Sequence, residues 1–188
     1  MHRIAYIVLF LFVVATCGLL PVFAESRGVA RQAAGDFPVV ITDPQNPIAS
    51  IEILTDDGGR VDWSAELNQL AFDRRGADGY YDVYTMQPDG SNVQCLTCSN
   101  SDLPKKNKGN PVWHPSGGYI VFQAEKRFQI FSSYWSEPGR GFNNDLWIST
   151  ADGGQAVKLR TVKRRMGVLH PHFSRDGSKL FWSEKTGS

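Results

Sequence analysis

The chain has 188 residues, and its 20 basic and 19 acidic side chains give a formal charge of only +1 at pH 7. Hydrophobic residues make up 41% of it, an ordinary fraction for a globular protein. Nucleic-acid-binding proteins usually carry a strong basic excess, so this balance predicts that the chain has no nucleic-acid partner.

The first 24 residues differ from the rest and are typical of a secretory signal peptide. Arg3 gives a positive start, the apolar run IAYIVLFLFVVATCGLL follows, and VFA precedes Glu25 as a small-residue cleavage site. The run approaches the length that spans a bilayer, so an uncleaved anchor is the alternative. Cys17 follows a threonine and precedes further apolar residues, which disfavours lipid attachment. We predict cleavage, no membrane span afterwards, export to the periplasm or beyond, and a linker over residues 25–48.

The remainder contains an internal repeat. Three stretches align, each with an aromatic residue, a short turn and an alternating strand: VDWSAELNQLAFD from Val61, PVWHPSGGYIVFQ from Pro111 and PHFSRDGSKLFWS from Pro171. A second pair also aligns, YDVYTMQPDGSNVQCLT from Tyr81 and NDLWISTADGGQAVKLR from Asn144. Asp-Gly between alternating runs is a strong hairpin signal. Each complete unit is therefore predicted to have four short strands.

A repeating four-stranded antiparallel unit predicts an all-β fold, the β-propeller, with blade boundaries at 49–104, 105–165 and a partial 166–188. One such sheet cannot bury both faces, so the blades must stack, with a core of Leu70, Phe72, Val121, Phe122, Leu180 and Trp182. Residues 49–58 are expected to form one more strand, which closes the ring onto the last blade. Propellers typically have four to eight blades, and about two and a half are present. Further C-terminal blades, or a ring assembled from several chains, would complete it.

The segments WHPSGGYIVFQ and FSRDGSKLFWS resemble the WD-like repeat of TolB-type propellers, and DLWISTADGG and DVYTMQPDGS resemble the third strand and turn of that family. The resemblance covers about residues 50–188. The first copy departs from the pattern, with SAELN in place of the Pro-Asp-Gly turn, and the second has Ser116-Gly117 where Asp-Gly is usual. The resemblance implies a partner platform, a ligand binder or an enzyme domain, because these motifs specify the blade and not the function.

Two cysteines, Cys95 and Cys98, remain once the predicted signal peptide is removed. In an oxidising compartment a pair this close is expected to form a local disulfide. Unpaired thiols and a redox-active pair are the alternatives. One pair cannot complete a four-ligand zinc site, and no histidine follows it to indicate haem attachment.

Three histidines lie beyond the predicted signal peptide: His114, His170 and His172. The last two alternate on the predicted innermost strand, so both side chains are expected to face the central channel. Propeller-fold lyases that act on pectin fragments hold a divalent metal near the channel with histidines, which makes His170 and His172 weak metal candidates. We expect structural roles for them, because neutral imidazoles often serve as hydrogen-bonding groups. The sequence contains no Gly-x-Ser-x-Gly, His-Glu-x-x-His or phosphate-loop motif, and no cofactor or catalytic residue is predicted.

The connections at one rim of the blades are expected to be electropositive. They carry Arg74, Arg75, Lys105, Lys106, Lys108, Lys126, Arg127, Arg140 and the run Lys163, Arg164, Arg165. The same rim has the longest insertion, EKRFQIFSSYWSEPGRGFNN from Glu125, which is rich in aromatic residues. Long loops of this kind are usually functional or disordered, and the aromatics disfavour disorder. The predicted ligand-binding residues are Arg127, Tyr134, Trp135, Arg140, Lys163, Arg164 and Arg165. The alternatives are that the charges are solvated loop charges, diluted by Asp78, Asp102, Glu125 and Glu137, and that the aromatic residues extend strands or pack over the channel mouth.

Two functions are compatible with these patterns. The first is an exported, non-catalytic TolB-like propeller that binds an envelope protein or an anionic glycan. The second is the propeller of an envelope enzyme, either a metal-dependent oligosaccharide lyase or a serine peptidase with an N-terminal propeller. The lack of a catalytic motif favours the first.

Overall fold

A computed structural model describes residues 4–9, 48–128 and 132–185 of the chain. These residues form β-strands and one short 3-10 helix, η1 (Ser133–Ser136). The strands are β1 (Ile4–Leu9), β2 (Ile48–Thr55), β3 (Gly59–Ser64), β4 (Gln69–Arg75), β5 (Tyr81–Met86), β6 (Gln94–Cys95), β7 (Lys108–Trp113), β8 (Tyr119–Glu125), β9 (Asn144–Thr150), β10 (Ala156–Arg160), β11 (Gly167–Phe173) and β12 (Leu180–Lys185). In this part of the chain no helix has the length and apolarity needed to cross a membrane.

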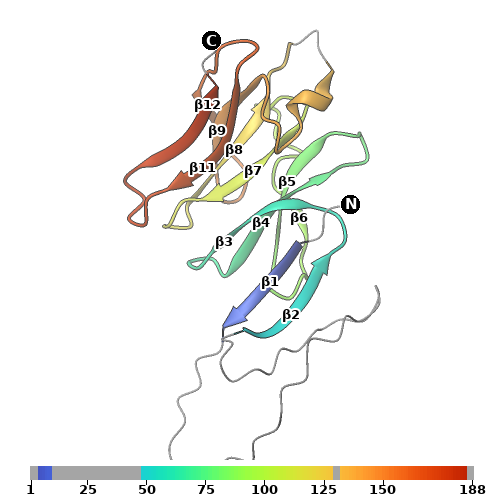
Figure 1. Cartoon of the computed structure of the whole chain (residues 1–188), viewed down its shortest axis with the longest axis vertical. Coiled ribbons are helices and arrows are strands. Elements are labelled where there is room, and N and C mark those ends of the chain that lie inside the picture. The colour runs from blue at the N-terminus through green and yellow to red at the C-terminus, as the bar shows by residue number, and fades with distance from the viewer. Residues whose placement is uncertain (1–3, 10–47, 129–131, 186–188) are drawn as a thin grey trace, which may run out of the picture.

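The strands form antiparallel sheets that follow one another along the molecule (Figure 1). We call the sheet β3–β4–β5–β6 blade 1, the sheet β7–β8–β9–β10 blade 2 and the pair β11–β12 blade 3. The predicted architecture is therefore confirmed: an all-β partial propeller with four-stranded antiparallel blades and a two-stranded third one.

The strand expected over residues 49–58 is β2. It pairs with β1, and Leu54 packs against the core of blade 1; its expected role in closing the ring onto the last blade stays a prediction. The connection from β2 to β3 has only three residues, which keeps the strand beside blade 1. β1 lies inside the predicted signal peptide, whose residues 10–24 are outside the described part, as is most of the predicted linker; both stay predictions.

Asp-Gly turns close the hairpins as the sequence indicated. Asp176 is an example: its Oδ1 accepts the backbone N–H of Ser178 at 3.1 Å, and Gly177 takes a φ of 72° that side chains rarely adopt. The hydrogen bond from the Ser174 hydroxyl, followed by those from the backbone and side chain of Ser178, lowers the pKa of Asp176 to about 2. In the divergent first copy, Asn68 supplies the positive φ, at 50°.

The core lies between successive blades. Ala71 and Val83 of blade 1 pack in one cluster with Trp113 and Phe122 of blade 2, and a second cluster joins blade 2 to blade 3 through Val121, Leu146, Val168 and Phe173. Four of the six predicted core residues are buried: Leu70, Phe72, Val121 and Phe122. Leu180 is partly buried against the second cluster.

The prediction for Trp182 was wrong, since 39% of this residue is exposed. Phe72 and Phe122 occupy the equivalent position in blades 1 and 2, and both are completely buried. In those blades a third strand pairs beside β4 and β8. β12 pairs only with β11 within the described residues, so part of the indole stays in contact with water.

Candidate functional site

The connections after the second strand of a blade and between blades meet at one edge of the molecule. We call this edge the loop rim; it comprises residues 76–80, 96–107, 126–128, 132–143 and 161–166. Hydrogen bonds join its segments. Lys106 Nζ lies 3.2 Å from the Tyr80 hydroxyl, and the Arg127 guanidinium donates to the carbonyl of Asp102 at 2.6 Å. The rim is therefore one continuous surface.

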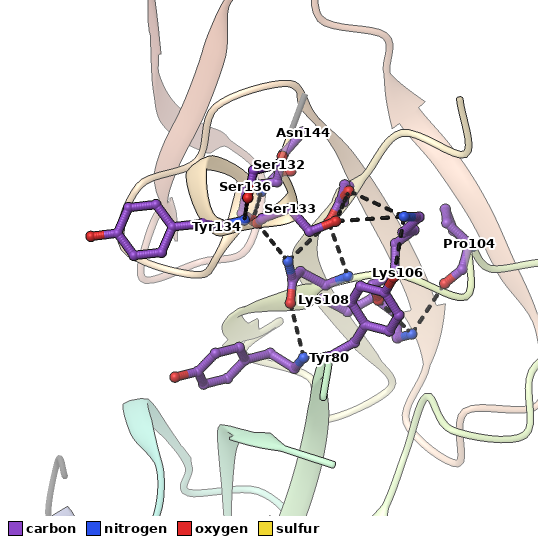
Figure 2. Close-up of polar contacts among 12 residues, drawn as sticks. Tyr80, Pro104, Lys106, Lys108, Ser132, Ser133, Tyr134, Ser136 and Asn144 are labelled. Carbon is purple, nitrogen blue, oxygen red and sulfur yellow. Dashed lines mark hydrogen bonds and ion pairs between the residues drawn. The ribbon is translucent and has the colours of Figure 1, made fainter. Parts of the chain in front are cut away.

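A buried carboxylate organises the middle of the loop rim. Glu125, the last residue of β8, is completely buried, and its oxygens accept from the side chains of Asn107 at 2.9 Å and Ser133 at 2.8 Å. Lys106 Nζ lies 3.9 Å away. Asn107 also accepts the backbone N–H of Tyr81 at 3.0 Å, so the network ties blade 1 to blade 2. Figure 2 shows Lys106 and Ser133 joined in this network, with the Tyr134 ring pointing away from it.

Burial raises the pKa of the Glu125 carboxyl, against the opposing effect of its hydrogen bonds and of Lys106. A carboxyl whose pKa is higher in the folded state loses stabilisation as the pH rises from its ordinary pKa through the raised value. Because glutamine cannot ionise, the free energy of unfolding of wild type relative to Glu125→Gln is expected to be larger at pH 4 than at pH 8. Urea unfolding of both proteins across this range measures the difference, and a constant difference would contradict the prediction.

The insertion places its aromatic residues at the surface. Ser132 caps η1 by accepting the N–H of Tyr134 at 3.3 Å. Tyr134 and Trp135 are 49% and 56% exposed, and their rings meet edge to face at 5.4 Å. The guanidinium of Arg140 lies 3.7 Å from the centroid of the Tyr134 ring. Tyr134 also lines a pocket of about 420 Å³ between blades 1 and 2.

A second and larger cleft, of about 620 Å³, lies farther along the loop rim. We call it the basic cleft, because its lining includes five basic side chains and one carboxylate: Lys126, Arg127, Lys158, Lys163, Arg164 and Asp145. Asp145 is buried and ion-paired with Lys126 and, at 2.9 Å, with Lys158. Within the described residues no carboxylate pairs with Arg127, Lys163 or Arg164. Phe128, which is 86% exposed, and the face of Trp147 add apolar surface.

The structure divides the predicted ligand-binding residues between two places. Tyr134, Trp135 and Arg140 form one cluster, whereas Arg127, Lys163 and Arg164 line the basic cleft. Arg127 was expected beside Tyr134 and Trp135, because all three lie in one insertion. Arg165 is exposed and has a φ of 66°, and it does not line the cleft.

The expected basic rim is less charged than its sequence suggests. Lys108 is buried, 5% exposed, with its ammonium 2.9 Å from Asp82. Arg75 is paired with Glu137, and Arg74 stacks on the Tyr84 ring at 4.3 Å. Among the described residues of the loop rim, three cations that pair with no carboxylate, Arg127, Lys163 and Arg164, lie together in the basic cleft. Sequence reasoning missed Asp145 and Lys158 as parts of that cleft, although an aspartate recurs at the start of the third strand in both complete copies, as Asp82 and Asp145.

The innermost strands meet around a cavity of about 170 Å³. Each carries a bulge at the same place, where Arg60, Asn110 and His170 take positive φ values of 43°, 51° and 53°. His170 and His172 both line this cavity. Among the described residues, the histidines belong to no group of three potential metal ligands.

His114 has structural contacts at the edge opposite the loop rim, where the tight hairpin turns lie. Its Nε2 lies 3.2 Å from the carbonyl oxygen of Gly177, and its ring packs edge to face on Phe173 at 4.9 Å. It therefore joins the turn of blade 2 to blade 3. The predicted disulfide between Cys95 and Cys98 is confirmed, with a Cα–Cα distance of 5.7 Å.

Comparison with known proteins extends these observations. The chain matches no protein-family model and no curated protein sequence. Its structure is similar to that of a protein assigned as TolB from Agrobacterium tumefaciens, with a TM-score of 0.56 and 21% identity over 72% of this chain and 46% of that one. TolB from Acinetobacter baumannii gives a TM-score of 0.51 and 18% identity over 73% of this chain and 30% of that one. The chain thus spans less than half the length of either protein, and it has the fold of part of a TolB-like β-propeller.

Proposed function

We propose that this chain is part of an exported, non-catalytic TolB-like propeller that binds an anionic envelope partner, an acidic glycan or a protein surface, in its basic cleft. One observation carries the proposal: five basic side chains and one carboxylate line a single cleft beside an exposed phenylalanine. Asp145 is already neutralised by Lys126 and Lys158, so the charge of the other three cations is available to a ligand. A concave surface of one charge attracts and orients partners of the opposite charge.

The proposal predicts that charge reversal in the cleft weakens polyanion binding. In Lys163→Glu/Arg164→Glu, the affinity for polygalacturonate is expected to fall by about tenfold or more, equivalent to about 1.4 kcal/mol or more. Titration calorimetry at low salt measures it, because raised salt screens such contacts. The matched control is Arg175→Glu/Lys179→Glu, which reverses two exposed charges at the turn of blade 3, away from the cleft.

Unchanged affinity in the cleft variant, or an equal loss in the control, would contradict the proposed site. Polyglutamate serves as a second probe: tighter binding to it than to polygalacturonate favours an acidic protein partner over a glycan. Shortening of polygalacturonate by the protein would contradict the non-catalytic role and favour the lyase alternative.

A further inference from the structure

The disulfide between Cys95 and Cys98 lies in a chemically distinctive place. Cys98 is exposed and Cys95 half-buried. Cys98 lines a pocket of about 310 Å³ together with Asp78, Asp82, Tyr84, Lys105 and Lys108. Both sulfurs and a carboxylate oxygen of the buried Asp82 lie within 4.8 Å of one another. An incoming thiol can therefore reach the disulfide from its exposed side, and the ion pair of Asp82 and Lys108 lies on the other side.

The fold has little need of this bond. It closes a loop with a sequence separation of three residues, and so short a loop removes less entropy from the unfolded chain than a long one does. Blade 2 provides an internal comparison. In blade 1, Tyr84 of the third strand pairs with Cys95 of the fourth. The equivalent pair in blade 2 is Trp147 and Lys158, so the fourth strand pairs with the third there without a disulfide. A purely structural role does not account for the pair.

We propose that Cys95 and Cys98 form a redox-active disulfide that exchanges with a dithiol, an activity separate from the proposed binding of anions. The pocket supplies what the chemistry requires. Lys108 is already paired with Asp82, so the positive charge that favours a thiolate at Cys98 comes from the exposed Lys105, which lines the pocket together with Asp78. The backbone N–H of Cys98 donates to Cys95 Sγ at 3.1 Å, which stabilises the charge that develops when that sulfur leaves.

The exchange proceeds in two balanced steps. A thiolate of the dithiol attacks Cys98 Sγ, the bond to Cys95 breaks, and its electron pair moves to Cys95 Sγ, which takes up a proton. The second thiol of the donor then loses its proton and attacks the donor sulfur of the mixed disulfide, which releases Cys98 as a thiolate that takes up the second proton. Two electrons and two protons pass to the protein, and the donor becomes a disulfide. Attack falls on Cys98 because it is the exposed sulfur.

The test compares single-cysteine variants. Cys95→Ser leaves Cys98 free, and Cys98→Ser leaves Cys95 free. Formation of a mixed disulfide with oxidised glutathione at pH 7, followed by mass spectrometry, is expected to be about tenfold faster or more for Cys98 than for Cys95. The wild-type disulfide is expected to be reduced by dithiothreitol in the folded protein, with little change in the thermal unfolding temperature. Reduction that requires unfolding, or equal slow reaction of both thiols, would overturn the proposal.

A charge variant tests whether the pocket activates the thiol. Lys105 is exposed, so Lys105→Glu in the Cys95→Ser background should fold normally. Its Cys98 is expected to react several-fold more slowly at pH 7 and equally fast at a pH where the thiol is fully ionised. Lys179→Glu, in the turn of blade 3, is the matched control and leaves the rate unchanged. The same loss at every pH would indicate blocked access and would contradict activation by charge.

Discussion

Lys108→Met is expected to lower the free energy of unfolding by about 3–5 kcal/mol, because it leaves a buried carboxylate without its counter-charge. Lys108 Nζ lies 2.9 Å from Asp82 Oδ1, and the two side chains are 5% and 6% exposed. The ammonium also donates to the carbonyls of Pro104 at 3.1 Å and Lys106 at 2.9 Å. Methionine fills a similar volume and makes none of these bonds. Urea unfolding at pH 7 measures the loss.

The double variant Asp82→Asn/Lys108→Met separates the charge from the packing. With the carboxylate gone, the uncompensated charge disappears, and the oxygen of the introduced amide can still accept from the Thr97 hydroxyl, which lies 2.7 Å from Asp82 in the wild type. We expect this protein to be more stable than Lys108→Met alone. Strictly additive losses from the two substitutions would show that the pair is not coupled. Lys105→Met, at an exposed position nearby, is the control for loss of a positive charge.

Phe122→Ala is expected to cost about 3–5 kcal/mol of unfolding free energy, through lost burial and the cavity left behind. Phe122 is completely buried and belongs to the cluster that joins blades 1 and 2. Removing it therefore weakens both a blade and the contact between blades. The loss should appear as a lower urea midpoint.

Trp182→Ala is the matched control, because Trp182 occupies the equivalent position in blade 3 and is 39% exposed. Its cost is expected to be about 1 kcal/mol or less. Equal losses at the two positions would contradict the exposure of Trp182 and would mean that a further element covers blade 3.

The sequence predicted local structure well, because strand alternation and turn chemistry are properties of neighbouring residues. The Asp-Gly turn at Asp176 and the pairing of β7 with β8 across Pro-Ser-Gly-Gly follow from such patterns. The disulfide was also predictable, since its cysteines are three residues apart. The candidate site was predicted only in part. Arg127, Lys163 and Arg164 were named, but their meeting in one cleft depends on how the connections of one blade fold against each other.

By itself, the sequence determined the repeating four-stranded unit, its alternating core positions and its turns, since these depend on periodicity and on the backbone preferences of glycine and asparagine. The tertiary structure alone decided which charges remain available. Lys108 is a buried partner of Asp82, and Glu125 is the centre of a hydrogen-bond network between blades. The basic cleft has more basic side chains than carboxylates. The physical reason is that charge pairing and burial depend on contacts across blades, between residues that no local pattern relates.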